Sequence, residues 1–270
     1  MVTSSNYIME SEEESLRLDW KTDTAQVCQQ ALWAGIKPGM RVADIGCGPG
    51  KTTSCLNELV QPDGSAVGID FSGQRILYAE NHNQARGLTF IQKDFLAPLD
   101  ELGAVDFIWI RFVLEYHRSR SYEIIKNITK ILEPGGILCM IDLDLNCLCH
   151  YGMPRRLELA VFNIMDTLEK HADFDPYAGR KLYSFCYDLG YEDIDVSVAS
   201  HHLFYGGINA SDMYNWTQKV KIAAKESGYD FKEYGGDYHC FYREFQDFFS
   251  NPKRFTYTPL IACRGRKPSL

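Results

Sequence analysis

Short apolar runs bounded by turn residues recur through the first half of the chain. They lie at residues 42–45, 65–70, 88–91, 105–110 and 137–142. Runs of this kind are typical of buried strands, and the segments between them repeat apolar residues at helical spacing, as in Ile124, Ile125 and Ile128. Strands that alternate with helices predict an α/β fold with a doubly wound, mostly parallel sheet. In such a sheet, ligands bind at the carboxyl ends of the strands.

The second half of the chain departs from this alternation. Amphipathic helices are predicted near 157–168 and 179–189, and strands at 192–199 and 257–263. Residues 200–253, between these two strands, form an unusually long excursion with many Phe, Tyr and Trp residues. One helix of this segment carries an apolar stripe made of Met213, Trp216, Val220 and Ala224. A long aromatic insertion at a sheet edge predicts a lid or a substrate pocket, with a dimer surface as the alternative.

The chain is acidic, with a net charge of −8 over 270 residues. Because phosphate neutralisation needs a basic face, this balance argues against nucleic acid as the main partner. No apolar run approaches membrane-spanning length, and residues 1–15 are polar and acidic, unlike a signal peptide. Nine cysteines, an odd number scattered through predicted core elements, indicate reduced thiols and a cytoplasmic location.

Three glycines at alternate positions follow the first strand, and a helix begins just after them. Gly46, Gly48 and Gly50 let the backbone turn tightly and let a ligand approach main-chain N–H groups. This pattern predicts a nucleotide-type cradle. A dinucleotide fingerprint fails because its third glycine would fall on Lys51, and a phosphate-binding loop fails because its first glycine would fall on Ile45.

Asp44, in the first strand, indicates the charge of the ligand. Its carboxylate would face a pyrophosphate as a second anion in a small cleft, but it suits a cationic amino group. We therefore expect a ligand that carries a positive charge and no phosphate.

The segment from Asp44 to Gly50, Asp-Ile-Gly-Cys-Gly-Pro-Gly, closely resembles the first motif of class I S-adenosylmethionine-dependent methyltransferases. Three further motifs of that family follow in order at 68–72, 93–95 and 132–136, so the resemblance covers about residues 36–145. It implies a Rossmann-like, seven-stranded sheet whose last strand is antiparallel to its neighbour. It also implies S-adenosylmethionine as the cofactor and S-adenosylhomocysteine as the product.

The chain then divides into four predicted parts. Residues 1–35 are expected to form an N-terminal helical cap, and residues 36–199 the S-adenosylmethionine-binding core. Residues 200–253 are the helical and aromatic insertion, interpreted as a lid that contributes the acceptor pocket. Residues 254–270 are the last strand, which completes the core.

The resemblance also implies which residues hold the cofactor. Asp70 is expected on the ribose hydroxyls, with Phe71 next to it in the same motif, and Asp94 and Phe95 are expected beside the adenine. The other core residues of the predicted set are Asp44, Gly46, Cys47, Gly48 and Arg111.

An N-terminal segment folded over the cofactor would add Tyr7 and Arg17. Arg17 would then pair with the methionine carboxylate of the cofactor. The alternative for Arg17 is a surface ion pair with Glu13, four residues earlier on a helix.

The catalytic candidates are His117, His202 and Tyr205. His117 follows the fourth strand, and a histidine titrates near neutrality, which suits a general base. The alternative for His117 is a residue at the start of a helix, in solvent. His201 and His202 are adjacent, so on a strand their side chains should point to opposite faces and could not easily share a metal ion.

No metal is predicted, although two carboxylates could bind one. Asp142 and Asp144 come just past the fifth strand, where they could coordinate a divalent ion.

The expected activity is transfer of a methyl group from the sulfonium of the cofactor to an O, N or C atom of a small organic acceptor. Alignment of the two reactants and exclusion of water supply much of the barrier reduction. A general base is needed only where the acceptor arrives protonated.

Two other classes of protein stay open: a non-catalytic S-adenosylmethionine-binding regulatory protein, and an NAD-dependent oxidoreductase, which the missing third glycine opposes. The predicted partner is a small-molecule acceptor, with no nucleic acid and no membrane, and a homodimer is left open.

Overall fold

The computed structural model describes residues 22–269. The predicted cofactor contacts of Tyr7 and Arg17 therefore lie outside the described residues. Helix α2 (Thr24–Ala34) begins at Asp23, whose side chain accepts a hydrogen bond from the Gln26 N–H, and ends at Gly35 in the left-handed conformation. Between residues 22 and 269, no helix is both long and apolar enough to cross a membrane.

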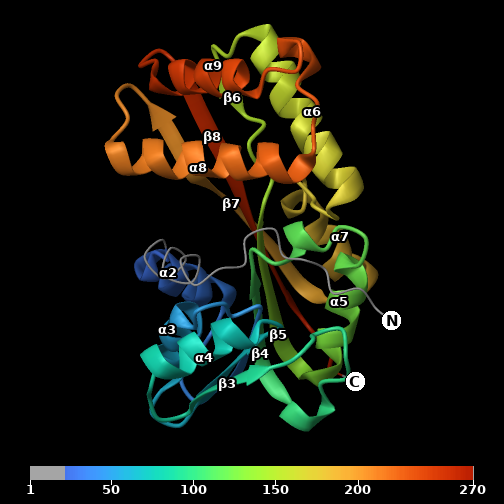
Figure 1. The fold of residues 1–270 in the computed structure, drawn as a ribbon. Coiled ribbons are helices and arrows are strands. Elements are labelled where there is room, and N and C mark those ends of the chain that lie inside the picture. Colours follow the sequence, from blue (N-terminus) through green and yellow to red (C-terminus); the bar gives the residue numbers. More distant parts are fainter. Residues whose placement is uncertain (1–21, 270) are drawn as a thin grey trace.

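Five parallel strands form the centre of the sheet (Figure 1). They are β1 (Arg41–Ile45), β2 (Ser65–Asp70), β3 (Leu88–Gln92), β4 (Val105–Arg111) and β5 (Leu132–Leu143). Their spatial order is β3-β2-β1-β4-β5, and the antiparallel strand β8 (Phe255–Arg266) continues the sheet beside β5. The predicted mostly parallel α/β sheet is confirmed. Because the chain order reverses between β1 and β4, their carboxyl ends form the switch point where such sheets bind ligands.

Helices cover both faces of this sheet (Figure 1). On one side lie α2, α3 (Lys51–Val60) and α4 (Gly73–His82), and on the other α5 (Ser121–Ile128) and α7 (Leu182–Asp188). Successive side chains of β4 point to opposite faces, so Phe107 and Trp109 pack into the core under α2 and α3, whereas Ile108 packs under α5 and α7. Short 3₁₀ turns connect several elements: η1 (Asp100–Leu102), η2 (Leu114–Tyr116), η3 (Thr129–Ile131), η4 (Gly179–Lys181) and η5 (Lys232–Tyr234).

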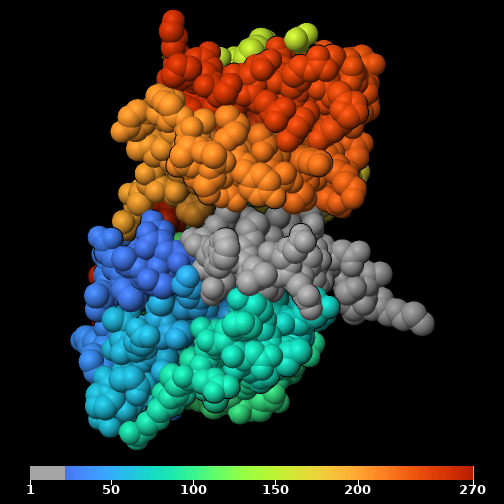
Figure 2. All heavy atoms as spheres, turned by 60° about the vertical axis from the view of Figure 1, so that its left-hand side comes forward, coloured from blue at the N-terminus to red at the C-terminus, as the bar shows by residue number. Residues whose placement is uncertain are grey.

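A second lobe, here called the helical lobe, stands beyond the carboxyl ends of the central strands (Figures 1 and 2). Strands β7 (Glu192–Tyr205) and β8 run from the core into it. Its helices are α6 (Arg155–His171), α8 (Ala210–Ser227) and α9 (Tyr238–Ser250). Their apolar faces share one cluster, whose largest buried side chains include Trp216, Phe241, Phe245 and Phe249. The insertion thus has a hydrophobic core of its own, and α6 contributes to it although residues 36–199 were assigned to the cofactor-binding core.

Several strands differ from the sequence-based expectation. β5 begins at Leu132, five residues before the predicted start at 137, because Leu132 pairs with Val105, and β8 spans Phe255–Arg266 where 257–263 was predicted. β7 continues to Tyr205, six residues past the predicted end at residue 199, because Phe204 packs against Trp216 and Phe249 and keeps the strand paired with β8. A two-residue strand, β6 (His150–Tyr151), also pairs with β8. Over residues 22–269 the sheet therefore has eight strands, against the seven expected.

Candidate functional site

The turn after β1 leaves open space at one glycine. Gly46, Gly48 and Gly50 all have positive φ angles, of 74°, 55° and 87°. A Cβ atom at Gly46 would lie 2.3 Å from Val113, and one at Gly50 would lie 2.7 Å from Phe90, whereas one at Gly48 would meet no atom of residues 22–269 within 4 Å. Gly46 and Gly50 are thus required by packing. Gly48 is the position where a ligand can approach the backbone.

Asp70 ends β2 directly beside this turn. Its Oδ2 accepts a hydrogen bond of 2.9 Å from the Gly48 N–H, and its Oδ1 accepts one of 2.9 Å from the Ser72 N–H. Each carboxylate oxygen has a second lone pair, so both oxygens can accept one further hydrogen bond. The side chain is buried against the turn and is positioned to bind two vicinal hydroxyl groups.

Asp44 lies beneath the turn and is 2% exposed. Its Oδ2 accepts a hydrogen bond of 2.7 Å from the hydroxyl of Thr53 on α3. Burial raises the pKa of Asp44 to about 7; the hydrogen bond from Thr53 opposes this shift, the charge of Asp70 adds to it, and the charge of Arg111 opposes it. A cation that bound next to Asp44 would compensate the buried charge.

Arg111 ends β4, the strand beside β1. Its Nη2 donates a hydrogen bond of 3.2 Å to the Gln26 side chain on α2, and its guanidinium lies 4.1 Å from the centre of the Phe112 ring. Burial lowers the pKa of Arg111 to about 10, against the opposing charges of Asp44, Asp142 and Asp23, so the side chain stays cationic. Its buried Nε has no hydrogen-bond partner among the described residues. This donor is available to an anionic group of a ligand.

The residues predicted beside the adenine lie next to these groups along the sheet. Phe71 follows Asp70 and is half-exposed, so its ring offers an apolar surface. Asp94 is exposed and uses Oδ1 to accept the Leu96 N–H at 2.8 Å. Phe95 is buried in the core, and Cys47 is buried under the turn with its Sγ 3.8 Å from the Gly48 carbonyl oxygen.

His117 packs against Phe95, one of the residues predicted beside the adenine. Its ring meets the Phe95 ring edge-on at 5.4 Å between centroids. Burial lowers its pKa, and the charges of Asp173 and Asp94 oppose that shift. His117 is therefore grouped with Phe95 and Asp94, not with His202.

His202 lies in the helical lobe, with its ring 5.4 Å from the Trp216 ring. The expectation that His201 and His202 point to opposite faces was wrong. A register shift between Ser200 and His202 disrupts the alternation, and the two imidazole rings lie 4.2 Å apart. The His201 ring also lies 5.0 Å from the Phe112 ring, between centroids, and the Arg111 guanidinium stacks on that same Phe112 ring. This contact connects β7 with the end of β4.

Tyr205 was predicted together with His202, but the structure separates the two side chains. Because β7 remains a strand to Tyr205, residues 202 and 204 face Trp216, while Tyr205 pairs with Phe255 on the opposite face and is 66% exposed. We therefore leave Tyr205 out of the candidate site.

A buried polar group between the two lobes was not predicted as a unit. Glu115, in η2 after β4, accepts a hydrogen bond of 2.8 Å from the Asn146 side chain, and Lys219 of α8 donates one of 2.8 Å to the Asn146 Oδ1. Burial raises the pKa of Glu115, and the charge of Lys219 is the largest effect that opposes this shift. Two signals could have indicated the group: Asn146 follows the end of β5, and Lys219 lies one turn beyond Trp216 on the apolar stripe.

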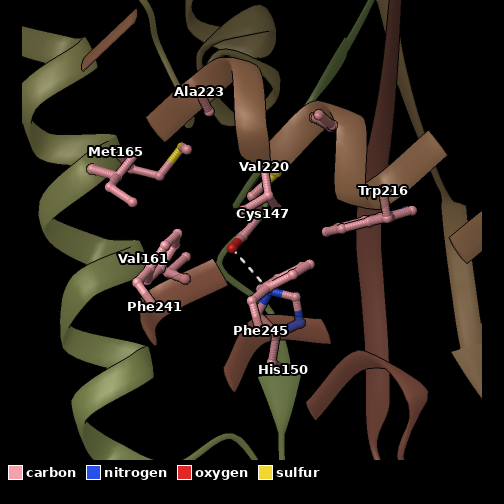
Figure 3. A pocket seen from close by; sticks show the side chains of 11 residues that line it. Cys147, His150, Val161, Met165, Trp216, Val220, Ala223, Phe241 and Phe245 are labelled. Atoms are coloured by element: carbon pink, nitrogen blue, oxygen red, sulfur yellow. Dashed lines mark hydrogen bonds between the residues drawn. The ribbon is translucent and has the colours of Figure 1, made fainter. Parts of the chain in front are cut away.

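The interior of the helical lobe contains a cavity of about 20 Å³, room for one water molecule (Figure 3). Its walls include His150, Trp216, Val220 and Phe245. His150 Nε2 lies 3.0 Å from the Cys147 carbonyl oxygen, so Nε2 carries the proton, and burial lowers the pKa of His150 to about 4. This neutral, enclosed histidine packs inside the lobe, and the cavity is too small for an organic acceptor.

The two carboxylates considered for a metal are both engaged by protein groups. Asp144 forms a bidentate pair with Arg180, at 2.7 and 2.9 Å, and Asp142 accepts the backbone N–H groups of Leu114, Glu115 and Leu143. Within residues 22–269, no three side chains of metal-binding type gather at one point.

The structure thus brings Asp44, Asp70, Gly48 and Arg111 together at the switch point. Within the described part of the chain, it offers there one open approach to the backbone, two carboxylates and a guanidinium N–H without a hydrogen-bond partner. Such a site suits a zwitterionic ligand that also carries vicinal hydroxyls.

A family model described as a methyltransferase domain matches residues 36–184. Among curated proteins, demethylmenaquinone methyltransferase from Lactococcus lactis is 29% identical over 135 residues, which is 49% of this chain and 52% of that protein. The chain thus spans about half the length of this relative.

Solved structures show the same fold at low identity. Phosphoethanolamine N-methyltransferase 2 from Haemonchus contortus, in complex with phosphomonomethylethanolamine and S-adenosylhomocysteine, is 13% identical with a TM-score of 0.59. That match covers 96% of this chain and 58% of that chain. The cyclopropane synthase from Mycobacterium tuberculosis is 15% identical with a TM-score of 0.53, covering 90% of this chain and 83% of the other.

These two structures bear names of different reactions, so the shared fold does not by itself name the acceptor. The match to residues 36–184 covers more than half of the chain and includes the glycine turn, Asp70 and the ends of β4 and β5. The chain therefore belongs to the methyltransferase-domain family, as its resemblance to class I S-adenosylmethionine-dependent methyltransferases predicted.

Proposed function

We propose that this protein transfers a methyl group from S-adenosylmethionine to a small organic acceptor. The observation that carries the proposal is the meeting of Asp44, Asp70 and Arg111 around the open backbone position at Gly48. The ligand that best satisfies these groups has an ammonium, a carboxylate and two ribose hydroxyls, and S-adenosylmethionine has all of them. When bound, it supplies a methyl group on a positively charged sulfur.

The residues present fit this cofactor group by group. Asp44 would face its ammonium, and Arg111 would use the unpaired Nε–H for its carboxylate. Asp70 would accept the ribose hydroxyls through its remaining lone pairs. Phe71 would lie against the adenine, and Asp94 keeps one oxygen free of the bond to Leu96 for a polar contact at its edge.

We infer that the acceptor binds between the end of β4 and the helical lobe. Support comes from two links across this region: the Glu115–Asn146–Lys219 group, and the contact of His201 with Phe112, which itself stacks on Arg111. Both links join a cofactor-side element to α8 or β7. They hold the lobe over the carboxyl ends of the strands, where it would exclude water and align the acceptor with the methyl group.

Two groups of this region can hold a proton. Glu115 has its pKa raised by burial, and the imidazole of His202 lies beside Trp216. Either can take a proton from a hydroxyl or ammonium acceptor, which a carbon or an unprotonated nitrogen acceptor would not need.

The nine cysteines are all free thiols. On this basis we propose that the protein works in a reducing compartment such as the cytoplasm.

Titration calorimetry with S-adenosylmethionine, S-adenosylhomocysteine and NAD tests the cofactor assignment. We expect binding of the first two compounds and none of NAD, and binding of NAD alone would refute the proposal. A screen of metabolite extracts with methyl-labelled donor then tests transfer. The Gly48→Val variant serves as the control without cofactor binding.

A further inference from the structure

Within residues 22–269, the helices of the helical lobe cover one face of its sheet and leave the face away from α8 and α9 exposed. Antiparallel pairing places Leu203 opposite Tyr257, and both Tyr205 and Tyr151 opposite Phe255, so these side chains share one face. Val198, paired with Ile261, lies on that same face of β7 and β8. We call the six exposed residues the outer patch: Tyr151, Val198, Leu203, Tyr205, Phe255 and Tyr257.

The two faces of these strands differ sharply in burial. Thr256 and Thr258 of β8 point toward the helices and are fully buried. Their neighbours Phe255 and Tyr257 point the other way and are 42% and 40% exposed, and Tyr151 is 75% exposed. The aromatic rings of the patch pack on one another, with Tyr205 stacked on Phe255 and Phe255 tilted against Tyr257. They form one surface, not scattered single side chains.

The outer patch is larger than the apolar patches of typical monomers and smaller than one side of a standard dimer interface. With about 200 Å² for a whole aromatic residue and somewhat less for Leu and Val, the exposed fractions amount to roughly 650 Å². The largest apolar patch on a typical monomer is about 300–600 Å², and a stable dimer buries about 800 Å² on each partner. The patch, together with its immediate surroundings, would supply one side of such a dimer.

The charges around the patch indicate what kind of partner fits. No Asp, Glu, Lys or Arg occurs in residues 196–205 of β7 or 255–263 of β8, although the whole chain carries a net charge of −8. Two copies of an acidic chain repel each other, and the cost of contact is lowest where the contacting surfaces carry no charges. An aromatic centre depleted of charged residues is also the composition of interface cores.

We propose that the outer patch is the interface of a homodimer, in which it packs face to face against the same patch of a second copy. A two-fold axis through the patch makes one surface serve both partners, so no second complementary surface is required. Sheets packed in this way lie about 10 Å apart and bury both inner faces. The proposal does not depend on the methyltransferase assignment.

The test is the molar mass of the full chain in solution. Light scattering after size exclusion, between about 1 and 100 µM, covers the range in which a micromolar dimer dissociates. We expect the mass of a dimer for the wild-type protein. Tyr205→Glu buries an unpaired charge at the interface, so we expect a monomer across the same concentrations.

Tyr214→Glu is the matched control, because Tyr214 is 64% exposed but lies on α8, outside the patch. It should remain a dimer. Should Tyr205→Glu fail to fold, Tyr151→Glu on the separate strand β6 makes the same test, and thermal unfolding verifies that each variant is folded. A wild-type monomer at about 100 µM would overturn the proposal, as would a dimer that survives both patch substitutions.

Discussion

Asp44 should control the affinity for the cofactor through its own ionisation. In the ligand-free protein its pKa is raised to about 7, chiefly by burial, although Thr53 donates a hydrogen bond to it and Arg111 lies nearby. An ammonium group binds the ionised form. Affinity for S-adenosylhomocysteine should therefore be constant above pH 7 and fall about tenfold for each pH unit below it, or about 1.4 kcal/mol per unit.

Protonation of Asp44 weakens cofactor binding but has the opposite effect on the ligand-free protein, whose folded state it stabilises. The folded pKa of Asp44 lies above its value of about 3.9 in an unfolded chain, so the protonated form stabilises the folded protein. That contribution is complete below about pH 4 and is lost as the pH rises to about 7. Asp44→Asn keeps an acceptor for Thr53 but has no charge to bury. At pH 8 the ligand-free variant should thus be more stable than the wild type, by up to roughly 4 kcal/mol.

Calorimetry between about pH 5.5 and 8, with Asp44→Asn as the control, measures how the affinity for S-adenosylhomocysteine depends on pH. Asp44→Asn should bind about 10- to 100-fold more weakly than the wild type at pH 8, with no further loss at lower pH. Denaturant unfolding of the two ligand-free proteins at pH 5 and pH 8 measures how ionisation of Asp44 changes the free energy of unfolding. The reasoning is refuted if wild-type affinity does not change with pH, or if the variant binds as well as the wild type at pH 8.

Three further substitutions test other parts of the site. Asp70→Asn keeps one acceptor for the Gly48 N–H but loses the charge-assisted bonds to the ribose, so calorimetry should show a loss of about 1.5–3 kcal/mol; unchanged affinity would remove Asp70 from the site. Gly48→Val should abolish cofactor binding in a folded protein. Gly228→Val, at a positive φ of 65° after α8 and with no atom of the described residues near its Cβ position, should keep it; equal losses in both would indicate backbone strain alone. Lys219→Met should lower the free energy of unfolding by about 1–3 kcal/mol at pH 8, because it leaves Glu115 without its cation, and by less at pH 5, where Glu115 is more protonated. Lys221→Met, exposed on the same helix, is the control, and a loss that does not depend on pH would contradict the pairing.

The central sheet and the glycine turn with its neighbouring carboxylates could be predicted from the sequence because their signals are local. The apolar runs predicted β1 to β5, since a strand between turn residues shows its burial within its own few positions. The side chains around the turn could also be recognised from neighbouring positions in the sequence, because Asp44 and Gly48 lie four residues apart and Asp70 ends the next strand. Parallel strands then bring their carboxyl ends to one edge without further information.

The connection between the helical lobe and the core depended on contacts that no local pattern shows. Lys219 reaches Asn146 across 73 positions, and Glu115 is bound by a side chain 31 positions away. The direction of Tyr205 followed from the length of β7, which Phe204 sets by packing on Trp216 and Phe249 of two other helices. The contact between His201 and His202 required a shift of strand register.

The chain by itself therefore determined the fold class, the cradle and the charge of its ligand, because these follow from backbone periodicity and from residues within one strand–turn–helix unit. Only the tertiary structure decided which face of β7 meets the helices, that α6 belongs to the helical lobe, and how that lobe is joined to the core. Those outcomes come from side-chain packing between distant segments, where burial of apolar surface is gained only once the whole lobe has assembled.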